Sequence, residues 1–197
     1  MEKQSVEEMR AEPGRKLPPV RRSQEERRRS TKLAVLRAVL DLLVDEGYLK
    51  LTVADVAERA QVSRGALSHY FRTKQDLVVA AACFAMDEAM ERIDRLSVQS
   101  ETPLDAVEAF LDDAEDFFLS RNYAAQIELT FAGKHDPMLA DIYFPFIAQY
   151  RIRFDTAWLK TMIRAGCDAE QAEALIKLTN YLMRGMVLTA NWTSDTR

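Results

Sequence analysis

The sequence predicts an all-α protein with an N-terminal helix-turn-helix domain followed by a larger helical bundle. Apolar residues recur at helical spacing along most of the chain, and no alternation typical of strands interrupts them. Several of these segments begin with a Ser, Thr or Asp that can cap a helix. Two of the helices, expected near 53–60 and 64–70, are short and separated only by a tight turn. Hydrophobic residues make up 48% of the 197 residues, which is enough for a sizeable core.

The N-terminal 22 residues are expected to form a tail outside any packed core, because they mix charges with four Pro and Gly residues. A solvated tail without a further role is one interpretation. The other is a basic arm that reaches DNA phosphates or the minor groove through Arg15, Lys16, Arg21 and Arg22.

A long amphipathic helix is expected over residues 23–46. Ser23 and Glu26 have the spacing of a capping box, and Gly47 is expected to end the helix. We expect this helix to pack behind the helix-turn-helix and to complete a three-helix domain.

The two short helices carry the most specific signal in the chain. Thr52 and Ser63 each precede a helical apolar pattern, and their hydroxyls can accept hydrogen bonds from free backbone N–H groups. Only Gln61 and Val62 separate the first helix from the cap of the second. This length suits a helix-turn-helix, whose second helix enters the major groove of DNA.

The segment VADVAERAQVSRGALSHYFRTKQDL, preceded by the long helix, resembles the N-terminal DNA-binding domain of TetR-family transcriptional repressors. The resemblance is strong over residues 24–77 and weaker beyond. Gln61 stands where this family often has Gly, and Ser68 stands where its recognition helix usually has its first aromatic residue. A side chain at Gln61 makes a left-handed turn conformation more costly than Gly does.

The resemblance implies a division of the chain and a function. Residues 23–77 are expected to form the DNA-binding domain, and residues 78–197 a bundle for ligand binding and dimerisation. A small molecule bound in the bundle would change the separation of the two recognition helices in a homodimer and release a palindromic operator. Activation instead of repression stays open.

The candidate DNA contacts gather at the start of the second short helix, where a recognition helix meets base edges. Arg64 is the best candidate for reading a base, since its guanidinium can bond guanine O6 and N7 together. Gly65 allows close approach, and the Ala66 methyl could contact thymine. The resemblance adds Tyr70 and Lys74 as phosphate contacts. The full set is Thr52, Ser63, Arg64, Gly65, Ala66, His69, Tyr70 and Lys74.

The charge is divided unevenly along the chain. Residues 1–80 contain sixteen Lys and Arg against twelve Asp and Glu, whereas residues 81–197 contain eleven against nineteen. The whole chain has a net charge of −4, which alone does not indicate nucleic-acid binding. A basic end joined to an acidic body is the distribution expected if only the N-terminal domain faces DNA.

Five more helices are expected, near 73–96, 103–119, 123–133, 137–165 and 169–192, the last capped by Asp168. Pro145 is expected to kink or divide the fourth of these, because Pro lacks a backbone donor and clashes with the preceding turn. The total is eight helices. Proteins of the TetR family generally have nine, so the resemblance leads us to expect a terminal helix that is missing, truncated or absent.

The last two predicted helices carry more apolar surface than one intramolecular contact requires. We expect a dimer interface there, with ordinary core as the alternative. The candidate residues are Trp158, Leu159, Met162, Ile163, Leu175, Leu178, Leu182 and Met186.

The body is expected to bind a small, mainly apolar effector that carries a few polar groups. Its walls are expected among apolar residues at helical spacing, which could equally be core: Phe84, Met90, Phe110, Phe117, Phe131, Tyr143, Phe144 and Tyr181. The candidate polar anchors are Gln126, Glu128, Arg151 and Asn180.

The sequence argues against catalysis, metal binding and any cofactor. His69 and His135 lie in different predicted domains, and no Ser/His/Asp arrangement or phosphate-binding Gly loop is present. The acidic pairs at 112–113 and 115–116 are expected on a solvated face. Cys83 and Cys167 lie far apart, which favours free thiols over a redox-sensing pair.

The chain has no apolar run near the roughly 18 residues that a membrane helix needs and no signal-peptide pattern, so a cytoplasmic location is expected. Two other functions stay open. One is a non-specific architectural DNA-binding protein. The other is a protein-interaction module that has lost specific DNA binding.

Overall fold

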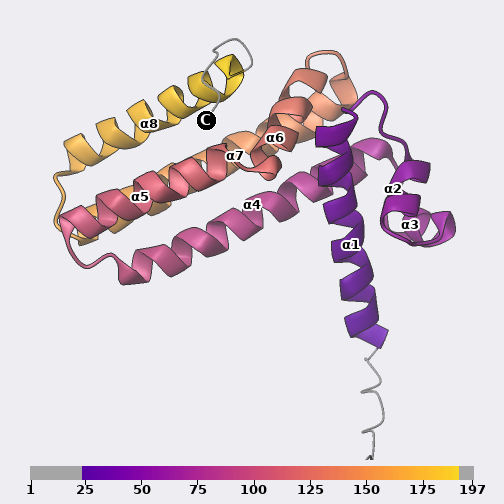
Figure 1. Cartoon of the computed structure of the whole chain (residues 1–197), viewed down its shortest axis with the longest axis horizontal. Helices are drawn as coiled ribbons and strands as arrows, with labels where there is room; N and C mark the ends of the chain where they lie inside the picture. The colour runs from indigo at the N-terminus through magenta and orange to yellow at the C-terminus, as the bar shows by residue number, and fades with distance from the viewer. Residues whose placement is uncertain (1–23, 191–197) are drawn as a thin grey trace, which may run out of the picture.

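The computed structural model describes residues 24–190, which form eight α-helices and, within that range, no strand (Figure 1). The all-α prediction is confirmed, with the helix-turn-helix at the N-terminal end and the bundle after it. The predicted tail, the Ser23 cap and the chain beyond residue 190 lie outside the described residues. The helices are α1 (Gln24–Asp45), α2 (Val53–Arg59), α3 (Arg64–Tyr70), α4 (Lys74–Gln99), α5 (Pro103–Phe118), α6 (Arg121–Ala132), α7 (Pro137–Arg164) and α8 (Ala169–Thr189).

The turn between α2 and α3 is built around a residue with positive φ. Gln61 has φ of 55°, so it adopts the left-handed conformation that Gly would supply more cheaply. The Val62 N–H bonds the Ala57 carbonyl at 2.9 Å and closes the end of α2. Both predicted caps form: Thr52 makes a capping box, and the Ser63 side chain accepts from the third residue of α3.

The long helix α4 connects the helix-turn-helix to the bundle (Figure 1). Thr73 and Asp76 form a capping box at its start, as the sequence predicts. Leu77 and Val78 in its first turns are fully buried against the N-terminal helices. Ile93, farther along, is buried in the body, so one helix serves both parts of the molecule.

Two groups of buried side chains make up the core. The first joins α1–α4 with residues of α6 and α7, including Leu129 and Leu139. The second is built around Phe110 and Trp158 and joins α4–α8. Because the first group crosses the predicted boundary after residue 77, the N-terminal helices pack directly on the body. The boundary itself stays a prediction.

α7 runs through Pro145 without interruption, so the possibility that Pro145 divides this helix is wrong. Pro145 and Asp141 are both exposed, and water can bond the Asp141 carbonyl that loses its helical partner. α7 therefore contacts α4, α5, α6 and α8 as one uninterrupted helix. None of the described helices is long and apolar enough to cross a membrane.

Candidate DNA interface and ligand cavity

The surface of α3 is set by one buried anchor. Leu67 is 1% exposed in the N-terminal core, and this contact fixes which side of the short helix faces outward. Arg64, Gly65 and Ser68 are all exposed. The Ser68 hydroxyl donates to the Arg64 carbonyl at 3.1 Å, so it bonds its own helix. Arg64 thus lies at the start of the helix, on a side that is exposed while Leu67 is buried.

Gly65 lies in open space. A Cβ built there would meet no heavy atom within 4 Å, so packing inside this chain does not require Gly. A close approach by another molecule is a use for this position that the fold leaves open. Ala66 is half-buried, Tyr70 is 39% exposed, and the side chain of His69 lies outside the described set.

The caps of α2 and α3 are exposed but occupied. The Ser63 hydroxyl accepts from the Ala66 N–H at 3.2 Å. The Thr52 hydroxyl donates to Asp55 Oδ2 at 2.6 Å and accepts from the Asp55 N–H at 3.3 Å. These bonds hold the helix starts in place, and phosphate contacts from either hydroxyl would have to be added to them.

Lys74 has an intramolecular partner that the sequence did not indicate. Its ammonium donates to the Tyr48 carbonyl and lies 4.2 Å from the centroid of the Tyr48 ring. Burial lowers the pKa of Lys74. A lysine ammonium has three donors, so a bond to Tyr48 is compatible with a second bond to phosphate.

Tyr48 lies at a junction between the N-terminal helices and the body. Its N–H donates to Glu128 Oε1 of α6 at 2.7 Å, and its hydroxyl donates to Asp136 Oδ2, before α7, at 2.5 Å. Gln75 of α4 donates to the same Asp136 oxygen at 2.9 Å. The Tyr48 hydroxyl holds the pKa of Asp136 below its usual value, while burial raises the pKa of Tyr48. Glu128 therefore faces Tyr48 and is not a polar anchor of the cavity.

The body contains a cavity of about 590 Å³, lined by residues of α4–α8. Three predicted wall residues do not line it. Phe84 packs against the N-terminal core, Met90 packs against the second core, and Phe144 lies at the surface beside Gly133. The predicted residues that do line it are Phe110, Phe117, Gln126, Phe131, Tyr143, Arg151, Asn180 and Tyr181.

One end of the cavity carries a closed set of hydrogen bonds. The buried Tyr143 hydroxyl lies 2.9 Å from Gln126 Oε1 and 3.0 Å from the Gln126 carbonyl, and burial raises its pKa to about 12. The Thr130 hydroxyl donates to the same Gln126 carbonyl at 2.8 Å. These groups bond one another, so they form part of the cavity wall and leave few donors or acceptors for a ligand.

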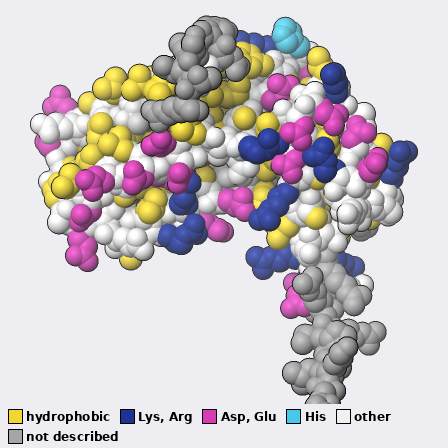
Figure 2. Space-filling model, viewed as in Figure 1, with side chains coloured by type: hydrophobic (Ala, Val, Ile, Leu, Met, Phe, Trp, Pro, Cys, Tyr) yellow, Lys and Arg dark blue, Asp and Glu magenta, His cyan; other side chains and the backbone are white. Residues whose placement is uncertain are grey.

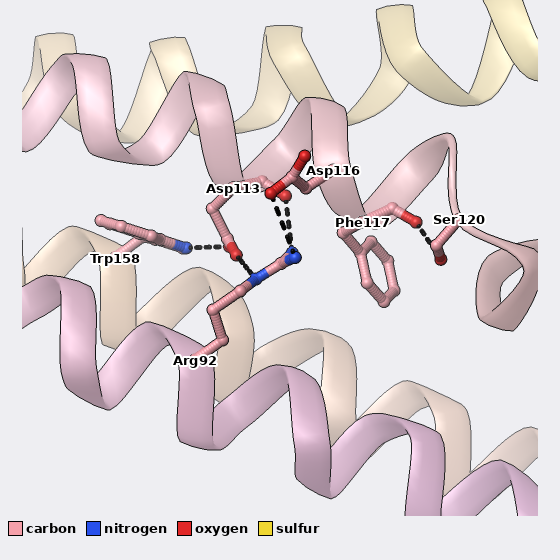
Figure 3. Close-up of polar contacts among 6 residues, drawn as sticks. All are labelled: Arg92, Asp113, Asp116, Phe117, Ser120 and Trp158. Carbon is pink, nitrogen blue, oxygen red and sulfur yellow. Dashed lines mark hydrogen bonds and ion pairs between the residues drawn. The ribbon is translucent and has the colours of Figure 1, made fainter.

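Asp113 is a buried carboxylate in the cavity wall, 5% exposed, so its predicted place on a solvated face is wrong. Figure 3 shows Arg92 of α4 and Trp158 of α7 directed at its two oxygens. Arg92 Nε donates to Oδ1 at 2.6 Å, and Trp158 Nε1 donates to Oδ2 at 2.9 Å. Burial raises the pKa of Asp113, and both donors oppose that rise. The spacing of Phe110, Asp113 and Phe117 on one helical face is the signal that could have placed it.

A second polar group lies where α7 and α8 face the cavity. Asn180 Nδ2 donates to Asp155 Oδ1 at 2.9 Å, and Arg151 and Arg184 line the same cavity. Burial raises the pKa of Asp155, against the nearby positive charges of Arg151, Arg184 and Lys177. Asp155 and Arg184 were not predicted from the sequence. Each lies four residues, about one helical turn, after a predicted anchor, Arg151 or Asn180, and this spacing is the signal that could have found them.

The predicted dimer residues divide into two sets. Trp158 and Met162 are 2% and 0% exposed in the second core, so their assignment to a dimer interface is wrong. Leu159 and Leu175 are partly buried against the same core. The exposed set is Ile163, Leu178, Leu182 and Met186, at 46%, 67%, 59% and 48%.

The described residues include no group of three His, Cys, Asp or Glu side chains that could hold a metal ion. Both cysteines are free thiols, and burial raises the pKa of Cys83. Cys83 packs against the first core and Cys167 against the second, so the two do not form a pair.

Comparisons with known proteins agree with this architecture. Residues 35–81 match the family model of bacterial regulatory proteins, tetR family. The chain is 30% identical over 177 residues to the HTH-type transcriptional regulator CymR of Pseudomonas putida, an alignment that covers 90% of this chain and 87% of that protein.

Solved structures share the fold at low sequence identity. A transcriptional regulator of Rhodococcus sp. Rha1 matches with a TM-score of 0.63 and 22% identity, over 81% of this chain and 82% of that chain. A protein of Saccharomonospora viridis, solved in complex with choline, matches with a TM-score of 0.62 and 17% identity, over 87% and 88%.

Proposed function

The chain belongs to the TetR family of bacterial transcriptional regulators, and from this premise we propose that it is a ligand-released repressor that binds a palindromic operator as a homodimer. The observation that carries the proposal is the placement of α3. Leu67 anchors this helix in the core, while Arg64 and Gly65 at its start are exposed. A helix held in this way can present its first turn to base edges in the major groove.

The proposed homodimer is supported by the surface of α8. Figure 2 shows hydrophobic side chains gathered along this helix. Leu178, Leu182 and Met186 are all about half exposed or more, and they recur at helical spacing on one side. An exposed apolar face of this kind is typical of a contact with a second protein surface. A two-fold dimer through α8 would place two copies of α3 against two half-sites.

The proposed ligand response is supported by the connection between cavity and junction. α6 contributes Gln126 and Thr130 to the cavity, and its Glu128 bonds the Tyr48 N–H. A ligand that prefers one position of α6 would thereby shift the N-terminal helices, and DNA would shift ligand affinity by the same factor. The choline complex of the Saccharomonospora viridis protein supports a small-molecule site in this fold.

Selection of bound sequences from a random DNA pool, at near-physiological salt, tests the proposal. Recovery of a two-fold palindrome, with half-sites about one helical turn or a multiple of it apart, is the expected result. A folded helical protein that enriches no motif would contradict specific recognition. It would favour the non-specific DNA-binding protein if affinity persists, or the protein-interaction module if affinity is absent even at low salt.

A further inference from the structure

Some charged groups of the cavity already have hydrogen-bond and ion-pair partners within the chain, and others keep free donors. The sign of the groups that keep free donors indicates the charge of the ligand. We propose that the cavity binds an apolar organic acid in its anionic form, with its carboxylate held by Arg151 and Arg184. The inference rests on the proposed ligand-binding role of the cavity and names the class of molecule that fits it.

The first cavity carboxylate is already neutralised. Asp113 has both oxygens bonded, one by the Arg92 guanidinium and the other by the Trp158 indole N–H (Figure 3). Arg92 also donates to the Asp113 carbonyl at 2.9 Å. A cationic ligand would therefore have to compete with a buried ion pair for Asp113, which is costly because Arg92 would lose its partner.

The second cavity carboxylate, Asp155, has more than one positive charge near it. Asp155 accepts a bond from Asn180, and it lies near the positive charges of Arg151, Arg184 and Lys177. Lys177 is paired with Glu173 and does not line the cavity, so one carboxylate, Asp155, faces two guanidiniums, Arg151 and Arg184, in this part of the wall. The field that a ligand meets there is positive, which opposes a cation and attracts an anion.

The two cavity guanidiniums have donor capacity that the described residues do not use up. Neither Arg151 nor Arg184 forms an ion pair within 4.0 Å in the described part of the chain. Arg184 lies over the Phe118 ring, with its Cζ 5.6 Å from the ring centroid. A guanidinium has five N–H donors in a planar fork that matches a carboxylate. These two residues are thus the natural partners of an anionic head group.

The rest of the cavity selects the body of the ligand. Phe117 lies 5.3 Å from Tyr123 and 5.5 Å from Phe154, centroid to centroid, and all three rings line the cavity. Contact between such a wall and apolar ligand surface is favourable, and the Tyr123 hydroxyl is the one polar group that these three side chains carry. A molecule with one charged end and an apolar, ring-sized body satisfies both parts of the site.

Three probes with one body and different charges test the inference: 2-naphthylacetate, its neutral amide, and the cationic 2-(2-naphthyl)ethylamine. Binding to the full chain is measured by titration calorimetry without DNA, so the result does not depend on operator recognition. The variants are Arg184→Met and Arg151→Met. Arg153→Met is the charge-matched control, because Arg153 lies on α7 like Arg151 but outside the cavity lining.

The acid is expected to bind at least about tenfold more tightly than the amide and the amine, since a charge-assisted bidentate bond has that effect. Arg184→Met and Arg151→Met should each remove most of this preference and leave amide binding unchanged, whereas Arg153→Met should keep it. If Arg184→Met fails to fold, the ligand preference of the wild type and the Arg151→Met variant still test the inference, since Arg151 is exposed and its replacement should not disturb folding.

Equal or tighter binding of the amide or amine would overturn the anionic assignment and leave the regulatory proposal standing. An acid preference that survives both substitutions would overturn the roles of Arg151 and Arg184. Absence of acid binding at millimolar concentration would also overturn the inference. Failure of the regulatory proposal is a separate result, because it appears as DNA binding that no ligand changes.

Discussion

Gln61 adopts a backbone conformation that is unfavourable for a residue with a side chain, and the fold accommodates it. Its φ of 55° costs an L-residue with a side chain about 1 kcal/mol or more. The conformation persists because Val56 and Leu67 on either side of the turn are buried in one core. The position of this turn could be predicted from the sequence but its conformation could not, since packing decides whether a strained φ persists.

Replacing Gln61 by Gly should therefore stabilise the protein. We expect Gln61→Gly to raise the free energy of unfolding by about 0.5–1 kcal/mol, because the relief of strain exceeds the entropy that Gly adds to the unfolded chain. Urea denaturation measures the change. Gln61→Ala, which keeps a Cβ, should give little gain, and a Gly variant no more stable than the Ala variant would contradict the strain.

The residues that line the cavity were predictable in part from their spacing in the sequence. Eight of the predicted residues line it because aromatic and polar side chains at helical spacing had to face the same interior. Asp113 was misplaced because its neighbour at 112 and the pair at 115–116 make the segment look solvated. Its burial depends on Arg92 and Trp158, which come from two other helices and have no sequence signal linking them.

At the scale of elements, the junction at Tyr48 explains why the N-terminal helices and the body form one unit. α1 packs against α4 and α6, and the loop after it bonds Glu128 and Asp136. Asp136 also caps α7 by accepting from the Leu139 N–H at 3.0 Å. One carboxylate thus joins the start of α7 to the segment that leads into the helix-turn-helix.

Asp136→Asn should weaken this junction in a pH-dependent way. At pH 7 we expect a loss of about 1 kcal/mol, because an amide accepts a weaker hydrogen bond from the Tyr48 hydroxyl than a carboxylate does. The pKa of Asp136 is lowered in the folded protein, so its stabilising effect is present above the usual pKa near 3.8 and is lost as pH falls through the folded value. The difference between the variant and the wild type should therefore begin to shrink only below the usual pKa near 3.8 and should vanish once the pH has fallen below the folded pKa.

The control for this change is Asp168→Asn, which alters the cap of α8 without touching the junction. Asn is also a good cap residue, so the loss there should be a few tenths of a kcal/mol. Chemical denaturation at pH 7 and below pH 4 gives both values. Equal losses at the two caps would show that the Tyr48–Asp136 bond does not stabilise the fold.

Element boundaries were predictable where a local signal sets them. Caps at Thr52, Ser63, Thr73 and Asp168 all form, because a short side chain and the helix start that it bonds are neighbours in sequence. The prediction that Pro145 divides a helix was wrong because the effect of Pro depends on exposure. At a buried position the lost hydrogen bond would break a helix, whereas Pro145 and Asp141 are exposed and the Asp141 carbonyl can bond water.

At the scale of the whole molecule, the face of α8 is the feature that a single chain leaves incomplete. Leu178 and Leu182 are 67% and 59% exposed, and Tyr181 between them is 64% exposed. Trp158 and Met162 were predicted on the same interface but are core, because apolar spacing does not separate a helix that packs within the chain from one that packs between chains.

Charges on this face should separate the proposed dimer. The double substitution of Leu178→Glu and Leu182→Glu should yield a folded monomer in sedimentation and should weaken operator binding by about 10²-fold or more, since the two half-sites would be bound independently. Val98→Glu, at an even more exposed apolar position on α4, should leave the dimer intact. A dimer that persists in the double variant would place the interface elsewhere.

The measurement that tests the central claim most directly compares wild type and Arg64→Ala on two duplexes. One carries the operator recovered by selection, and the other carries the same bases with both half-sites scrambled. Dissociation constants are measured by fluorescence anisotropy at a fixed, near-physiological salt concentration. Arg153→Ala, a change of the same charge on the body, is the control.

If α3 reads bases through Arg64, the variant should lose about 1–3 kcal/mol of affinity per contact for the operator and much less for the scrambled duplex. The Arg153→Ala variant should match the wild type on both. Equal losses on the two duplexes would contradict base reading by Arg64 and reduce it to a contact with the phosphate backbone.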